Sequence, residues 1–148
     1  GLTLLGGPGC GKTHVLEAIA HAVRGPKKAV RYVFVPDFLA RLRASFDPEA
    51  EARYEELWDS WAEADVLLLD DLMDSGKQTP WSVGQMERII DGRYRRGVPY
   101  AVATNGTFET IAQIWGKRVA DRLLDSHSGA VRVVFCAAPS YRTGRTWQ

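Results

Sequence analysis

The segment Gly6–Thr13 constrains the fold more than any other part of the 148-residue sequence. It reads GGPGCGKT and lies between a short apolar run and a stretch with helical periodicity. In such a unit the glycines let backbone N–H groups converge on phosphate oxygens, and the helix N-terminus adds its positive dipole end. We therefore expect a phosphate-binding loop, with Lys12 reaching the outer phosphates and the Thr13 hydroxyl on Mg²⁺. A glycine-rich turn with a solvated lysine is the alternative.

Short apolar runs alternate with helical patterns along the chain. Five runs have this character: Leu2–Leu5, Val30–Val35, Val66–Leu69, Tyr100–Ala103 and Val131–Cys136. They are apolar on both faces, as expected for buried parallel strands, and segments of crossover length separate them. The predicted class is therefore α/β, with three layers and right-handed crossovers. The length fits a single domain.

The segment between the second and third expected strands has room for two helices where a crossover needs only one. The first is expected from about Asp37 to Phe46. Asp47 is expected to cap the second, with Pro48 at the first helical position. The apolar stripe of this second helix consists of Tyr54, Leu57, Trp58 and Trp61. Such a stripe is typical of a core-facing helix, although aromatic side chains can also stack on bases.

Capping residues predict the helix boundaries in the second half of the chain. Thr79, which is followed by proline, is expected to start a helix that ends at Gly97. Thr107 is expected to cap a short helix, and Gly116 to separate it from the next one.

Composition narrows the class of protein. No apolar run approaches the roughly 20 residues that span a membrane, so we expect no membrane partner. Cys10 and Cys136 lack metal-ligand spacing, which favours a reduced, cytoplasmic protein. A net charge of +1 gives no overall attraction to nucleic acid, so any DNA contact must be local. Two basic groups could supply it or could simply be solvated: Arg24, Lys27, Lys28 and Arg31, and Arg93, Arg95 and Arg96.

Two adjacent carboxylates, Asp70 and Asp71, directly follow the third apolar run. Two negative charges beside a buried strand are costly unless a cation lies nearby. Ligands of an open parallel sheet lie at the carboxyl ends of its strands, where the phosphate loop also ends the first strand. We expect Asp70 to hold Mg²⁺ through its water shell and Asp71 to orient or deprotonate an attacking water. An exposed acidic turn is the alternative.

Three more polar residues could belong to the same site. Asn105 ends the fourth strand, where its amide could bond an outer phosphate and the water, or could simply form an Asn-Gly turn. Arg118 and Arg122 are four residues apart and share a helix face. They either pair locally with Asp121 and Asp125 or supply an arginine to a phosphoryl group across a subunit interface. Spacing alone favours local pairing.

The phosphate loop, LLLDDL, ATNG, GKRVADRLLD and the closing PSYR together resemble the AAA+ ATPases of the DnaC/DnaI helicase-loader and IstB transposition-helper group. The resemblance covers nearly the whole chain. It implies a P-loop NTPase of the AAA+/ASCE type, with a five-stranded parallel sheet of order 5-1-4-3-2. The extra helices between strands two and three resemble an insertion that contacts single-stranded DNA or a neighbouring subunit. Residues 1–148 would be the ATPase core, without the N-terminal partner-binding segment of such loaders.

The resemblance also implies a function. It implies an Mg²⁺-dependent ATPase that associates with itself through its ATP interfaces and loads a replicative helicase onto single-stranded DNA. A transposition helper with a transposase as client is one alternative. Another is a module in which ATP controls DNA or partner binding with little turnover.

Residue by residue, the resemblance assigns roles to matching positions. Lys12 and Thr13 match the Walker A pair, and Asp70 and Asp71 match the Walker B acids. Asn105 matches sensor 1. The implied ATP-binding residues are Gly6, Gly7, Pro8, Gly9, Cys10, Gly11, Lys12, Thr13, His14 and Arg142.

The resemblance gives the arginines separate roles as well. Arg122 matches the arginine finger that acts on a neighbour's ATP, and Arg118 lies on the same face as a candidate support. Arg142 matches the sensor 2 arginine near the γ-phosphate.

Overall fold

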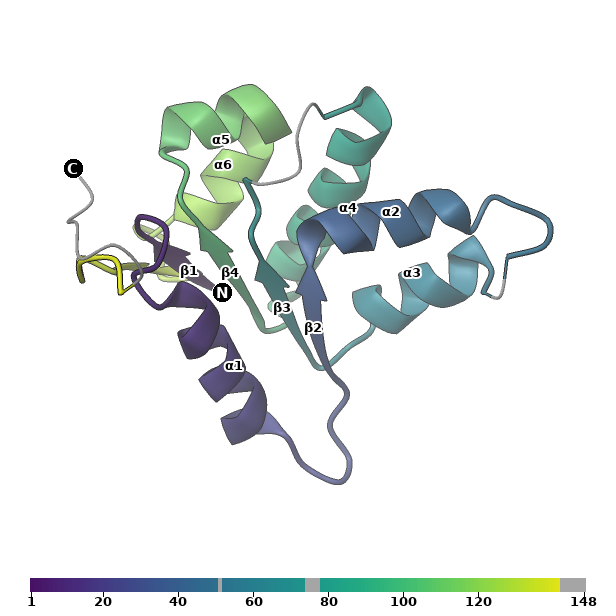
Figure 1. Ribbon diagram of the computed structural model, residues 1–148, viewed down its shortest axis with the longest axis horizontal. Helices are drawn as coiled ribbons and strands as arrows, with labels where there is room; N and C mark the ends of the chain where they lie inside the picture. Colours follow the sequence, from purple (N-terminus) through teal and green to yellow (C-terminus); the bar gives the residue numbers. More distant parts are fainter. Residues whose placement is uncertain (51, 74–77, 142–148) are drawn as a thin grey trace.

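The computed structural model describes residues 1–50, 52–73 and 78–141. Strands and helices alternate through these ranges (Figure 1). In chain order they are β1 (Leu2–Leu5), α1 (Lys12–Val23), β2 (Val30–Phe34), α2 (Val35–Ala44), α3 (Tyr54–Ala62), β3 (Val66–Asp70), α4 (Pro80–Arg96), β4 (Tyr100–Thr104), α5 (Phe108–Trp115), α6 (Lys117–Leu124) and β5 (Arg132–Phe135). No helix in the described ranges is long and apolar enough to cross a bilayer.

The strands form one parallel sheet of order β2-β3-β4-β1-β5. This is the implied order 5-1-4-3-2 counted from the other edge, so the predicted fold class and order are confirmed. In this register Leu5 pairs with Thr104, and Phe34 pairs with Asp70. The carboxyl ends of β1, β3 and β4 therefore meet at one edge of the sheet.

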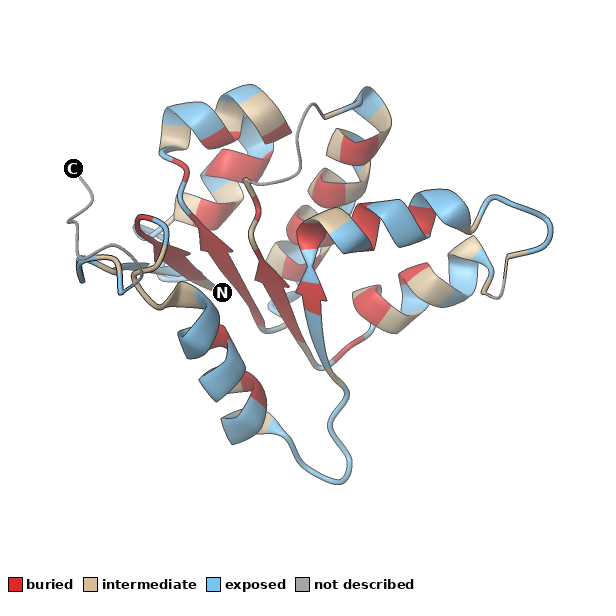
Figure 2. Ribbon diagram, in the orientation of Figure 1, coloured by how far each residue is buried: buried red, intermediate tan, exposed pale blue. Residues whose placement is uncertain are grey.

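Helices cover the sheet unequally. Buried residues of α2 to α6 pack with Val33, Leu67, Leu69 and Val102 on one face. On the other face Leu16 and Ala20 of α1 pack against alternate residues of the central strands. This alternation follows from the two-residue period of a strand. Figure 2 shows the central strands as the most continuously buried part of the molecule.

The edge strands differ from the prediction of burial on both faces. Tyr32 and Phe34 in β2 are 38% and 37% exposed, and Phe135 in β5 is 73% exposed. Each edge strand has a neighbour on one side only, and among the helices of the described ranges only α1 contributes to the smaller core. The apolar pattern of these two runs therefore indicates strands but not full burial.

The expected cap at Asp47 is wrong. Asp47 Oδ1 accepts a hydrogen bond from the N–H of Glu49 at 3.0 Å, and its backbone carbonyl accepts one from Ala50 at 3.0 Å. Aspartate readily bonds the backbone two residues ahead, and here that contact closes a turn instead of starting a helix. The helix begins later, at Tyr54.

The aromatic stripe of α3 is part of the core. Trp58 and Trp61 are each 6% exposed, and the Trp61 ring lies 4.3 Å from the ring of Phe38 in α2. Rings buried in this way are unavailable for stacking on bases. The two-helix insertion between β2 and β3 is thus confirmed, with its tryptophans facing inward.

The predicted caps of the later helices are confirmed. Thr79 Oγ1 accepts from the N–H of Ser82 at 3.2 Å at the start of α4, which ends at Gly97 in the left-handed conformation. Thr107 caps α5, and Gly116 at φ 91° separates α5 from α6. Local capping chemistry therefore determined these boundaries.

Arg93 is buried, which removes it from the candidate DNA contacts. It is 1% exposed and lies in the last turn of α4. Its guanidinium donates to four backbone carbonyls, those of Trp61, Ala62, Ala64 and Pro99, at 2.7 to 3.2 Å. Burial lowers the pKa of Arg93 to about 10. The side chain thus connects the end of α3 with the segments just before β3 and just before β4.

Candidate nucleotide-binding site

The glycine-rich loop between β1 and α1 has the conformation that its sequence predicts. Gly9 and Gly11 adopt φ angles of 78° and 95°, a region that favours glycine. A Cβ atom on Gly9 would lie 2.3 Å from Ser140 Oγ, so this position also lacks room for a side chain. Helix α1 begins at Lys12, and its first N–H groups therefore face the loop, as in anion sites at helix N-termini.

A cavity of about 1130 Å³ opens beside this loop. Its lining comprises Pro8, Gly9, Cys10, Gly11, Lys12, Thr13, His14, Asp70, Asp71, Met73, Asn105, Ala138, Pro139, Ser140 and Tyr141. The fold thus brings together residues that follow four strands, β1, β3, β4 and β5, and that the sequence places far apart. It is large enough to hold a small molecule or cofactor, whose sites are commonly about 300 to 1,000 Å³.

Lys12 lies over the loop. Its Nζ atom donates hydrogen bonds to the carbonyls of Gly6 and Gly7 at 2.7 and 2.8 Å. Gly6 and Gly7 are themselves buried and hold the lysine instead of lining the cavity. The ammonium therefore sits at the cavity with a defined position.

Asp70 accepts hydrogen bonds on both of its carboxylate oxygens. Its Oδ2 atom accepts hydrogen bonds from Thr13 Oγ1 at 2.9 Å and from the Tyr32 hydroxyl at 2.5 Å. Its Oδ1 atom accepts from the N–H of Asp71 at 3.0 Å, and the residue is 7% exposed. The predicted proximity of Thr13 and Asp70 is thus present.

The donor set at this point suits Mg²⁺. A hydroxyl and a carboxylate side by side are hard oxygen ligands, and Mg²⁺ commonly takes one or two protein ligands together with phosphates and waters. No three His, Cys, Asp or Glu residues gather as a metal site in the described ranges. An ion held mainly by phosphate and water does not need such a cluster.

Asp71 differs from Asp70 in its backbone. Its φ angle is 57°, the one positive value for a residue other than glycine in the described part of the chain. The chain leaves the strand here, and the N–H of Leu72 donates to the Ala103 carbonyl at 3.2 Å. Two consecutive acids therefore have different directions, and both line the cavity.

Asn105 lies at the mouth of the same cavity. It is exposed and follows β4, whose last residue, Thr104, is buried. Thr104 Oγ1 accepts a hydrogen bond from the N–H of Gly106 at 3.1 Å, which shapes the turn that carries Asn105. The amide is therefore placed beside the phosphate loop and the two acids, as the sequence predicts.

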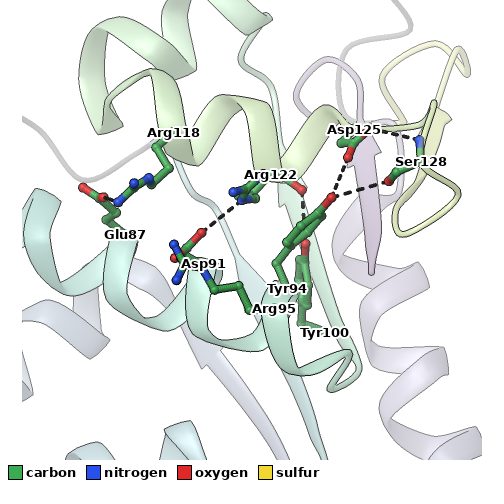
Figure 3. A network of polar contacts seen from close by, with 9 residues as sticks. All are labelled: Glu87, Asp91, Tyr94, Arg95, Tyr100, Arg118, Arg122, Asp125 and Ser128. Atoms are coloured by element: carbon green, nitrogen blue, oxygen red, sulfur yellow. Dashed lines mark hydrogen bonds and ion pairs between the residues drawn. The ribbon is translucent and has the colours of Figure 1, made fainter.

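Arg118 and Arg122 share one face of α6, and that face packs against α4 (Figure 3). Arg122 Nε donates to Asp91 Oδ1 at 3.0 Å, and Arg118 Nη1 donates to Glu87 Oε1 at 2.8 Å. The local pairing with Asp121 and Asp125, which spacing alone favoured, is therefore wrong. Neither arginine lines the cavity of its own chain.

Two features of the site were missed in the sequence. Tyr32 reaches Asp70 from the neighbouring strand, and burial together with this hydrogen bond raises the pKa of Tyr32. The residues at 138–141 line the cavity, and the N–H of Tyr141 donates to the Gly9 carbonyl at 3.1 Å. Strand alternation could have placed Tyr32 on the α1 face, but only the register of β2 and β3 brings it to Asp70. Arg142, the expected sensor 2 residue, lies outside the described residues.

A family model described as IstB-like ATP binding protein matches residues 1–147. The chain belongs to this family. The resemblance to the helicase-loader and transposition-helper group is thereby confirmed, and the P-loop architecture is that of an ATP-binding family.

The curated relatives that match this IstB-like chain include an uncharacterised protein and a helicase loader. YqaM of Bacillus subtilis (strain 168) is 31% identical over 119 residues, which is 76% of this chain and 36% of YqaM. The replicative helicase loader DnaC of Escherichia coli (strain K12) is 28% identical over 120 residues, which is 80% of this chain and 47% of DnaC. The chain thus spans less than half the length of these relatives.

The fold is also that of a known crystal structure. The structure of the DnaC helicase loader superimposes with a TM-score of 0.70 and 24% identity, covering 90% of this chain and 76% of that chain. This likeness shows a shared fold.

Proposed function

We propose that this IstB-like protein binds Mg·ATP and hydrolyses it to ADP and phosphate. The observation that carries the proposal is the arrangement around Asp70, which accepts a hydrogen bond from Thr13, while Asp71 follows it at a φ of 57° and lines the same cavity. These residues lie beside a glycine loop of phosphate-binding geometry, in one cavity large enough for a nucleotide. The family's description as ATP binding supports the choice of nucleotide.

Each residue has a role in the proposed reaction, the in-line attack of water on the γ-phosphate. Loop N–H groups and Lys12 bind the outer phosphates. Thr13 and Asp70 would hold Mg²⁺, which would supply positive charge beside the phosphate oxygens. Asp71 orients the water or takes its proton, and Asn105 bonds the water and the γ-phosphate. Catalysis then comes mainly from positioning and charge stabilisation.

The proposal includes self-association. Arg122 lies outside the cavity of its own chain, so its proposed role as arginine finger requires the ATP of a neighbouring copy. An arginine supplied in this way is worth about 10³ to 10⁵ in rate. The expected sensor 2 role of Arg142 remains part of the same proposal.

The proposed client is a replicative helicase, which the protein would load onto single-stranded DNA in the cytoplasm. The supporting observations are a relative and a structural neighbour that are both described as DnaC helicase loaders. The match to the IstB-like model favours a second candidate, a transposition helper whose client is a transposase.

Pull-down of the protein with a replicative helicase and, in parallel, with a transposase separates the two clients. We expect ATP-dependent capture of the helicase. Capture of the transposase alone would contradict the loader assignment.

The third possibility, an ATP-gated module with little turnover, is tested by ATPase rates. We expect single-stranded DNA to stimulate hydrolysis by the wild-type protein, whereas Lys12→Ala should show no activity. ATP binding with no turnover, with or without DNA, would leave the gated module as the better description.

A further inference from the structure

Three residues of α4 form the surface that meets the arginines of α6. Glu87, Asp91 and Tyr94 follow one another at spacings of four and three, so they lie on one face of α4. Glu87 contacts Arg118, whereas Asp91 and Tyr94 both contact Arg122 (Figure 3). The two arginines are thus held in different ways.

Arg122 is held by one edge and one face of its guanidinium. Nε donates to Asp91 Oδ1 at 3.0 Å, and the group lies 4.5 Å from the centre of the Tyr94 ring. Neither Nη group makes a hydrogen bond within the described part of the chain. The side chain remains 29% exposed. The two Nη groups, which form the fork that grips a phosphate, are therefore available.

Arg118, in contrast, uses an Nη atom for its contact with α4. Its Nη1 atom forms the ion pair with Glu87 at 2.8 Å, so the fork itself is engaged in joining the helices. A phosphate would have to displace this contact. The two arginines share a helix face, but only Arg122 has its fork free to bind an anion.

The two residues that hold Arg122 are themselves fixed. Asp91 Oδ2 forms an ion pair with Arg95 Nε at 2.8 Å, which leaves Oδ1 for Arg122. The Tyr94 hydroxyl donates to Asp125 Oδ2 at 2.6 Å. Hydrogen bonds from Tyr94 and Ser128 lower the pKa of Asp125 to about 2, so Asp125 stays a charged acceptor near neutral pH.

We propose that Asp91 and Tyr94 of α4 are positioning residues for Arg122. They hold its guanidinium with both Nη groups available to a phosphate of the nucleotide bound by another copy of this chain. The inference rests on the proposed function, because it assumes that Arg122 acts on a neighbour's ATP. A phosphoryl-binding group displaced by about 1 Å can lose about 10²-fold in rate.

The test compares ATPase kinetics of Asp91→Ala and Tyr94→Leu with those of a matched variant. Both should lower kcat about 10²-fold with little change in KM for ATP, because the nucleotide site of each subunit is intact. Tyr94→Phe keeps the ring beneath Arg122 and should retain most of the activity. Glu87→Gln disturbs the neighbouring pair between the same helices and should behave like the wild type.

Mixed subunits distinguish positioning from a general structural role. Lys12→Ala subunits cannot use ATP but carry an intact Arg122, so they should restore hydrolysis at the sites of Asp91→Ala subunits. If the mixture stays inactive while each variant remains folded by circular dichroism, Asp91 acts in its own site and the proposal is overturned.

Arg122→Ala separates the positioning role of Asp91 and Tyr94 from the finger role of Arg122 itself. If Arg122→Ala is inactive while Asp91→Ala and Tyr94→Leu have the same kcat as Glu87→Gln, the positioning role is wrong but the finger role of Arg122 is supported. If Arg122→Ala itself hydrolyses ATP like the wild type, both the proposed finger role and the positioning role are wrong. Should Asp91→Ala not fold, Asp91→Asn and Tyr94→Leu carry the same comparison.

Discussion

At the scale of single residues, the site depends on how two neighbouring acids are separated. Asp70 ends β3 and accepts hydrogen bonds on both oxygens, including one from Thr13. Asp71 takes a left-handed conformation that costs a residue other than glycine about 1 kcal/mol. That conformation turns the second acid out of the strand direction, so the two carboxylates can serve an ion and a water separately.

Replacing each acid by asparagine is therefore expected to impair a different step of the reaction. Asp71→Asn should keep ATP bound and lower kcat by about 10² to 10⁴-fold, because it removes the proposed base. Asp70→Asn should instead raise the Mg²⁺ concentration needed for half-maximal activity. Nucleotide retention on a desalting column and Mg²⁺ titration of the ATPase rate measure the two effects. Matching phenotypes would contradict the division of roles.

Tyr32 offers a finer test of the metal site. Tyr32→Phe removes the hydroxyl that orients Asp70, and loss of such an orienting contact weakens metal binding by about 10-fold or more. We expect a higher Mg²⁺ requirement with kcat little changed at saturating Mg²⁺. Tyr54→Phe, which removes a hydroxyl bonded to Gln85 away from the cavity, is the matched control. An unchanged Mg²⁺ titration of Tyr32→Phe would show that its contact is dispensable.

At the scale of elements, α4 joins the two halves of the larger helical layer. Its end carries Arg93, which binds carbonyls at the end of α3, just before β3 and just before β4. Carbonyls at a helix end have no partner within the helix, and a buried guanidinium supplies several donors at once. Earlier in α4, Glu87 and Asp91 hold α6. Helix α4 thus connects the α2–α3 insertion to the helix of the proposed finger.

Arg93→Met should destabilise the fold strongly. It leaves several buried carbonyls without donors, each costing about 1 to 3 kcal/mol, so we expect a loss of at least about 3 kcal/mol in the free energy of unfolding. Urea denaturation followed by circular dichroism measures it. Arg95→Met, two residues along and with its side chain 61% exposed, should cost less than about 1 kcal/mol. Equal losses would mean that the buried hydrogen bonds contribute little.

At the scale of the whole molecule, the nucleotide cavity and the proposed finger lie in different places. The cavity is at the carboxyl ends of β1, β3 and β4, whereas Arg122 faces α4 and does not line the cavity. In one chain, the proposed nucleotide site and the proposed finger therefore lie on two different surfaces. Hydrolysis is then expected to depend on contact between copies.

Complementation between inactive variants tests this dependence. Arg122→Ala should bind ATP normally and lose about 10³-fold or more in kcat, because it lacks the proposed finger. Mixing it with Lys12→Ala should restore part of the activity through interfaces that combine one intact site with one intact finger. The ATPase rate is measured against mixing ratio and protein concentration. Normal hydrolysis by Arg122→Ala at every concentration would contradict action in trans.

The sequence by itself determined the features that have local causes. Glycines at positive φ form the loop before α1, and threonine caps start α4 and α5, because each depends on residues within one turn. The sheet also followed from its apolar runs. At Asp47 the local sequence did not decide the structure, since the same side chain can cap a helix or close a turn.

Only the tertiary structure decided which distant side chains meet. Tyr32 reaches Asp70 through the register of two strands, and Arg122 finds Asp91 instead of its neighbours in α6 because two helices pack face to face. Arg93 looked like a surface cation and is buried among carbonyls. The contacts Tyr32–Asp70, Arg122–Asp91 and Arg93–Ala64 join residues 38, 31 and 29 positions apart, and the chain between them has no local preference that fixes the pairing. Packing of the layers chooses the partners, because a buried polar group must be satisfied by whatever the fold places beside it.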